Sequence, residues 1–191
     1  MGTPLWTPTL AWLAAAMGAL MLAVVTPSET NLMGRLPSPA AQRLGQPAGP
    51  HTDRVLALVG FDRSHRGEIN SWIRGLRLDQ DDAINWVKMP VLNDPGTEDE
   101  RRAVEGRIRA SHRGTPQGSR VVPVFIDRDQ FIRAAGLSGM AHASVLVIDR
   151  DGQVLARAEG QYDPDRASAL RETLRLPPAP GPLASSFPPG K

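Results

Sequence analysis

Three side chains that could take part in catalysis lie within four residues of one another: Asp62, Ser64 and His65, in the stretch LVGFDRSHRGEINSWI. A serine can act as a nucleophile when a histidine removes its proton and an acid orients that histidine. Neighbours in sequence seldom meet this geometry, and Ser64 lacks the Gly-x-Ser-x-Gly turn that exposes such a nucleophile. We therefore predict a capped, solvated turn here and no catalytic triad.

A metal site is the second chemistry that these residues could support. Two histidines and a carboxylate can bind a metal, and His142 is expected to face His65 and Asp62 from a later loop. The chain has no local ligand spacing such as His-x-x-x-His, so we predict no metal and no cofactor. It also has no cysteine, which excludes disulfides and thiol chemistry by its own residues.

The turn that carries Asp62, Ser64 and His65 belongs to a predicted domain of alternating strands and helices, residues 52–176. Residues 54–61 are almost continuously apolar, as expected for a strand that is covered on both faces. The apolar residues that follow recur at helical spacing: Ile69, Trp72, Ile73 and Leu76. A strand that runs into an amphipathic helix therefore presents the turn at one end of a sheet.

Three more elements follow in the middle of the chain. Strands are predicted over residues 84–92 and 121–126, with a charged helix over residues 98–111 between them. Asp127 and Gln130 can form a capping box that begins a short helix ending at Gly136.

The last part of the domain predicts a hairpin and a closing helix. Residues 144–148 and 153–158 flank DRDG, a tight-turn sequence. Asp163 and Pro164 are an N-cap and first-turn pair. A parallel strand–helix–strand unit with an antiparallel hairpin predicts a three-layer α/β/α sandwich on a mixed central sheet.

The stretch VPVFIDRDQFIRAAGLSGMAHASVLVIDRDGQVLARAEG resembles the second half of thioredoxin-like domains, of the peroxiredoxin and membrane-anchored thiol-reductase kind. In those domains an acidic residue leads a helix that ends in Ala-x-Gly-hydrophobic. A strand ending in Asp-x-x-Gly and a closing strand ending in Gly follow. The resemblance extends over residues 54–176 and implies a thioredoxin-like fold.

The same resemblance implies a degenerate active site. In that family the turn after the first strand carries reactive cysteines, commonly followed by a Glu in the helix. Matching Glu68 to that Glu places Asp62 and His65 at the cysteine positions, and the usual cis-proline falls at Ala143. With His142, these turn residues are expected to be exposed. The candidate partner-binding residues are Asp62, Arg63, Ser64, His65, Arg66, His142 and Ala143.

A narrower resemblance concerns the segments INSWI, INWVKMPVL and LVIDRDGQVLARAEG. They are similar to the mitochondrial ATP synthase assembly-factor family, which has a cysteine-poor thioredoxin-like fold and acts at a membrane. This resemblance implies a non-catalytic assembly factor or scaffold, with subunits of an ATP synthase-like or respiratory membrane complex as partners. The alternative hypothesis is a thiol-independent or metal-dependent enzyme that uses Asp62, His65 and His142.

The N-terminal residues predict a membrane anchor. The first 34 residues contain no Lys or Arg, and residues 10–25 are continuously apolar. With Leu5 and Trp6 this stretch reaches the roughly 20 residues that cross a bilayer, and no small-x-small cleavage site follows it. We predict a single-pass anchor within residues 1–25, with a cleaved signal segment as the alternative. The folded domain is expected on the periplasmic or another extracytoplasmic side.

Composition accounts for the remaining segments. Residues 26–51 are predicted to be a Pro/Gly-rich linker, and residues 177–191 a disordered Pro-rich tail. The net charge is +2, and only two of the 22 basic residues are lysines. Five arginines cluster in or next to the predicted charged helix, but acidic residues balance them and no aromatics interleave. A salt-bridged surface helix and no nucleic-acid partner are therefore predicted.

Overall fold

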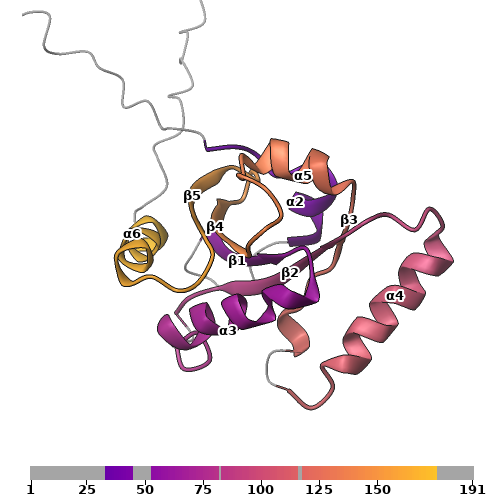
Figure 1. The fold of residues 1–191 in the computed structure, drawn as a ribbon, viewed down its shortest axis with the longest axis horizontal. Helices are drawn as coiled ribbons and strands as arrows, with labels where there is room; N and C mark the ends of the chain where they lie inside the picture. The colour runs from indigo at the N-terminus through magenta and orange to yellow at the C-terminus, as the bar shows by residue number, and fades with distance from the viewer. Residues whose placement is uncertain (1–32, 45–52, 82, 116–117, 176–191) are drawn as a thin grey trace, which may run out of the picture. The chain divides into compact units, whose positions relative to one another are not determined.

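A computed structural model describes residues 33–44, 53–81, 83–115 and 118–175. Its centre is a mixed five-stranded sheet with the order β3-β2-β1-β4-β5 (Figure 1). The strands are β1 (Arg54–Gly60), β2 (Trp86–Leu92), β3 (Val124–Phe125), β4 (Ser144–Asp149) and β5 (Val154–Glu159).

Helices cover both faces of this sheet. Those of the described residues are α2 (Ser38–Leu44), α3 (Arg66–Gly75), α4 (Glu98–Ser111), α5 (Arg128–Ala135) and α6 (Pro164–Arg175). Helices α3 and α6 pack on one face and α2 and α5 on the other, each pair over its own apolar cluster. The mixed α/β architecture predicted from the sequence is thus confirmed.

Strand directions define the topology. Strand β1 is parallel to β2, which is parallel to β3, whereas β4 is antiparallel to both β1 and β5. A parallel strand–helix–strand unit followed by a hairpin and a closing helix is the thioredoxin-like arrangement. The resemblance found in the sequence implied this fold.

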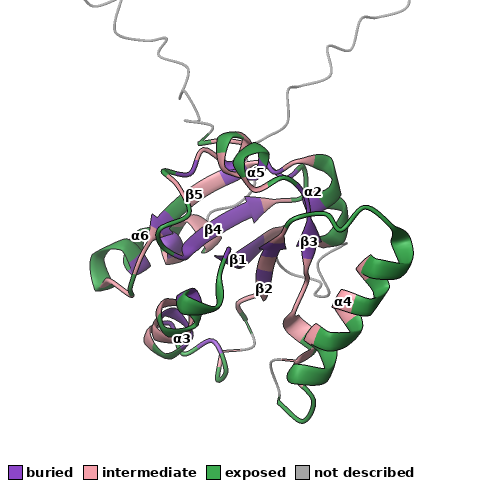
Figure 2. Cartoon of the chain, turned by 45° about the vertical axis from the view of Figure 1, so that its right-hand side comes forward, coloured by how far each residue is buried: buried purple, intermediate pink, exposed green. Residues whose placement is uncertain are grey.

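Two separate core layers explain the continuous apolar run of β1. Leu56 and Leu58 belong to the layer under α3 and α6, whereas Ala57 and Val59 belong to the layer under α2 and α5. Successive side chains of a strand point to opposite faces, so a strand covered on both sides needs apolar residues at every position. Figure 2 shows this burial along the central strands.

The third strand is shorter than predicted because Pro90 interrupts its pairing with β2. The Val122 and Ile126 amides donate to β2 carbonyls on either side of Pro90, at 2.8 and 2.9 Å. Pro90 has no N–H with which to pair in return. Regular pairing is limited to β3, so the strand predicted over residues 121–126 forms only in part.

Residues 33–44 lie within the predicted linker but belong to the folded domain. Leu36 and Ala40 are buried under the sheet face that carries α5. The backbone is also engaged, since the Arg35 amide donates to the Ala134 carbonyl at 2.7 Å. The linker prediction is therefore corrected for this segment. Residues 26–32 and 45–51 lie outside the described residues.

The predicted anchor or signal segment, residues 1–25, and the predicted tail, residues 177–191, also lie outside the described residues. Among the helices that the structure does describe, none combines the length and the apolar character needed to cross a bilayer.

Candidate functional site

The turn after β1 is a short 3₁₀ helix, Arg63–His65, that leads directly into α3. Asp62 caps it, since its carboxylate accepts the Ser64 amide at 2.9 Å. This hydrogen bond, together with one from the Ser64 side chain, holds the pKa of Asp62 below its ordinary value. The acid and the serine are therefore bonded to each other, and in the described part of the chain no hydrogen bond joins Ser64 to a histidine.

His65 is a core residue, which corrects the expectation that it is exposed. Only 4% of it is accessible. Its Nδ1 accepts the Phe61 amide at 3.2 Å, and the two rings pack edge to face with centroids 6.3 Å apart. Because Nδ1 is an acceptor, the ring proton lies on Nε2. The imidazole stabilises the end of β1 from inside the fold.

Glu68, in the first turn of α3, joins the turn to the loop before β4. One carboxylate oxygen lies 2.9 Å from Nδ1 of His142, and the other accepts the Ala143 amide at 2.6 Å. His142 thus approaches this end of β1, as the sequence predicted, but its partner is Glu68. Glu68 was not among the predicted binding residues. The signal that could have identified it is its match to the helix Glu of the resembled family.

The surroundings of Glu68 act on its ionisation in opposite directions. Burial disfavours the charged carboxylate and by itself would raise the pKa. The hydrogen bonds from the Ala143 amide and the His142 ring outweigh this effect, so the pKa lies below its ordinary value of 4.5. Glu68 is therefore an ionised acceptor at neutral pH and carries no proton to donate.

Ala143 occupies the position where the resembled family has a cis-proline, and none of the described peptide bonds is cis. The residue is fully buried. Its amide donates to Glu68, and its carbonyl accepts the Gly160 amide at 2.9 Å. The next residue, Ser144, is also buried, and its hydroxyl has no partner among the described residues. Both backbone groups of Ala143 are thus used within the fold.

The predicted binding residues therefore divide into two sets. His65 and Ala143 are buried and offer no side-chain surface. The exposed set, here called the turn surface, consists of Asp62, Arg63, Ser64, Arg66 and His142.

Metal binding requires several ligands that converge on one point. His65, His142 and Asp62 each contact a different partner: Phe61, Glu68 and Ser64. Among the described residues, no group of three or more histidines and carboxylates could hold a metal ion. The geometry therefore does not bring the proposed ligand set together.

Comparison with known proteins gives structural similarity only. No family model and no curated protein matches the chain. Similar solved structures include the N-terminal domain of PilB from Neisseria gonorrhoeae, at 12% identity and a TM-score of 0.38, covering 62% of this chain and 75% of that one. The pneumococcal exposed lipoprotein thioredoxin Etrx1 from Streptococcus pneumoniae matches at 11% identity and a TM-score of 0.38, covering 62% and 84%. A peroxiredoxin-like protein from Aquifex aeolicus matches at 14% identity and a TM-score of 0.35, covering 63% and 71%.

The class of the domain follows from its own topology. The sheet order and strand directions described above are thioredoxin-like. The described domain therefore has a thioredoxin-like fold, and the chain has no cysteine.

Proposed function

We propose that this chain is a non-catalytic thioredoxin-like module that binds a subunit of a membrane protein complex and assists its assembly. The observation that carries the proposal is that the turn after β1 has no reactive thiol and that its acceptor side chains are hydrogen-bonded within the fold. The scaffold has no cysteine, and Asp62, His65 and Glu68 each accept a backbone amide of the fold itself. A general base or nucleophile needs a group free to reach a substrate. An internally bonded turn instead favours a fixed surface for recognition.

The turn surface has the composition of a polar contact area. Arg63 and Arg66 supply two cations, and neither forms an ion pair with another described residue. Arginine is enriched among residues that dominate binding energy because its planar fork pairs with carboxylates and stacks on apolar groups. A partner loop that carries acidic residues fits this surface.

The membrane setting and the choice of partner rest on the sequence. The apolar residues 10–25 support a single-pass anchor that holds the domain at a membrane, on the periplasmic or another extracytoplasmic side. For the partner we propose a subunit of an ATP synthase-like or respiratory complex, on the resemblance of INSWI, INWVKMPVL and LVIDRDGQVLARAEG alone.

The test is a quantitative affinity purification from detergent-solubilised membranes. The wild type should retain a defined subunit set of one membrane complex. The charge-reversed double variant Arg63→Glu/Arg66→Glu should retain at least about tenfold less, as expected when an interface loses its arginine anchors. Arg74→Glu, at the far end of α3, is the matched control and should behave like the wild type. Equal recovery from all three proteins would contradict the proposal, as would a wild type that retains no complex.

A further inference from the structure

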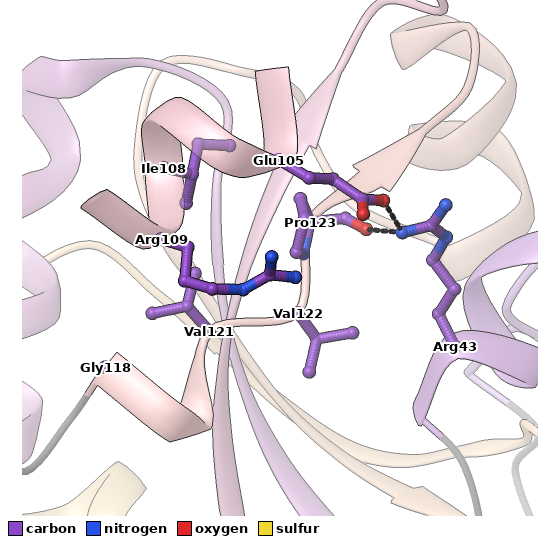
Figure 3. A pocket seen from close by; sticks show the side chains of 8 residues that line it. All are labelled: Arg43, Glu105, Ile108, Arg109, Gly118, Val121, Val122 and Pro123. Atoms are coloured by element: carbon purple, nitrogen blue, oxygen red, sulfur yellow. Dashed lines mark hydrogen bonds and ion pairs between the residues drawn. The ribbon is translucent and has the colours of Figure 1, made fainter. Parts of the chain in front are cut away.

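A pocket of about 220 Å³ lies beside the edge strand β3 (Figure 3), and no residue of the turn surface lines it. Its walls come from α2, from the second half of α4, and from the segment that leads into β3. The lining residues are Arg43, Glu105, Ile108, Arg109, Gly118, Val121, Val122 and Pro123.

One of the two arginines in this pocket already has partners. Arg43 forms an ion pair with Glu105 and donates to the Pro123 carbonyl at 3.3 Å. Its guanidinium also lies 5.4 Å from the centre of the Phe125 ring. The only carboxylate among the lining residues is therefore neutralised by Arg43.

The other arginine is not neutralised. The Arg109 side chain extends into the pocket in Figure 3. Within the described part of the chain, no hydrogen bond or ion pair engages its guanidinium. The pocket therefore combines one uncompensated positive charge with an aliphatic wall of Ile108, Val121 and Val122.

The second half of α4 adds further positive charge next to Arg109. In the first half of the helix, Arg101 and Arg102 pair with acidic residues that include Glu98. After Glu105 no acidic residue follows up to residue 113, whereas three arginines do: Arg107, Arg109 and Arg113. The salt-bridged helix predicted from the sequence is thus realised in its first half, and the second half is positive beside the pocket.

The size of the pocket indicates what it can hold. Sites for drug-sized ligands and cofactors are about 300–1,000 Å³, and 220 Å³ is smaller than that. The space suits one or two side chains of a polypeptide, of the kind that anchor an interface.

We propose that this pocket docks an acidic peptide segment of a partner protein. An aliphatic side chain of that segment rests on Ile108, Val121 and Val122, and a neighbouring carboxylate pairs with Arg109. This surface is separate from the turn surface, so the proposal does not depend on the function proposed above.

The probe is a fluorescein-labelled hexapeptide of alternating Leu and Asp, titrated with the full chain in detergent micelles and followed by fluorescence anisotropy. Binding should be saturable. Arg109→Ala should weaken it at least about tenfold, because a lost charge-assisted hydrogen bond amounts to one decade in affinity or more. Arg107→Ala is the matched control on the same helix, since Arg107 does not line the pocket. It should change the affinity less than about twofold.

Two further probes separate the parts of the proposed ligand. A Leu/Asn hexapeptide, which lacks the charge, and a Ser/Asp hexapeptide, which lacks the apolar anchor, should each bind at least about tenfold more weakly than the Leu/Asp probe. Absence of saturable binding would overturn the proposal, and so would an equal loss in Arg107→Ala. Displacement of the probe by free isovalerate at the same affinity would also overturn it, in favour of a site for a small organic acid. Thermal unfolding of Arg109→Ala establishes that the exposed substitution leaves the fold intact.

Discussion

At the turn after β1, two ionisable side chains accept backbone amides: the buried His65 and the half-buried Glu68. His65 accepts the Phe61 amide, and Glu68 accepts the Ala143 amide. Both are polar acceptors for N–H groups that would otherwise lose hydrogen bonds on burial. The residues at this site therefore have a structural role that can be measured separately from any binding role.

Replacing His65 with alanine should destabilise the fold by about 2 to 3 kcal/mol. The substitution leaves the Phe61 amide unsatisfied and removes a ring that packs against Phe61. Urea unfolding measures the change, with Arg63→Ala on the exposed side of the same turn as the control. That control should lie within about 0.5 kcal/mol of the wild type. Equal stability of the two variants would contradict the core role of His65.

Glu68 should give the fold an acid-sensitive contribution to its stability. Its pKa is lower in the folded state than its ordinary value of 4.5. The unfolded chain therefore takes up the proton first as pH falls. The stabilisation is complete above about pH 4.5 and is lost as pH falls through the folded-state pKa.

The comparison of wild type with Glu68→Gln isolates this contribution. The difference in unfolding free energy should be largest at neutral pH and shrink as pH falls below about 4.5. Glu172→Gln is the control, because Glu172 is exposed and its carboxylate forms no hydrogen bond or ion pair among the described residues. A difference between wild type and Glu68→Gln that stays constant from pH 7 to pH 3 would show that ionised Glu68 does not stabilise the fold.

The sequence predicted the position of His142 but not the burial of His65. That His142 faces the end of β1 follows from topology, since β4 begins where β1 ends. The burial of His65 could not be predicted, because a histidine between Ser64 and Arg66 in a polar turn has the pattern of an exposed residue. Only the packing against Phe61 reveals it.

At the scale of elements, local signals gave accurate boundaries. Helix α4 spans the predicted residues because Thr97 caps it and three acidic residues occupy its first turn. Helix α5 begins after the Asp127 cap and ends just before Gly136, whose φ of 69° lies in the left-handed region. Such signals act within a few residues and are readable from sequence.

Long-range effects were not readable in the same way. The shortening of β3 depends on Pro90 in the neighbouring strand. Residues 33–44 are held in the folded domain by partners about a hundred residues away, such as Ala134. Gly34 contributed to the linker prediction through composition alone. In the structure its φ is 146°, and a Cβ there would lie 2.5 Å from the Ala135 carbonyl carbon, so a close approach requires glycine.

Leu36→Ala tests whether this segment stabilises the domain. Leu36 is 3% exposed and belongs to the core layer under α2 and α5. Its truncation should cost about 2 kcal/mol or more in unfolding free energy, as for other buried leucines. Gln42→Ala, on the exposed side of α2, should lie within about 0.5 kcal/mol of the wild type. If the segment were only a linker, both variants would match the wild type.

For the whole molecule, the absence of cysteine predicts the absence of thiol chemistry. Thiolate is the nucleophile in disulfide exchange and in peroxide reduction by such domains, and this chain cannot form one. Insulin reduction and peroxide consumption by the purified chain should therefore equal the buffer blank. Sustained turnover without added metal would refute this prediction and point to a different reaction centre.

The apolar N-terminal stretch predicts how the whole chain distributes in a cell. Residues 10–25 with Leu5 and Trp6 are long enough to span a bilayer and precede no cleavage site. The full-length protein should stay in the membrane pellet after carbonate washing. A shortened chain of residues 32–191 should be released into the soluble fraction. It starts at residue 32 because the segment around the buried Leu36 belongs to the folded domain. Mass spectrometry of the full-length protein from cells distinguishes the alternative: a mature form that lacks roughly the first 25 residues would identify a signal peptide instead of an anchor.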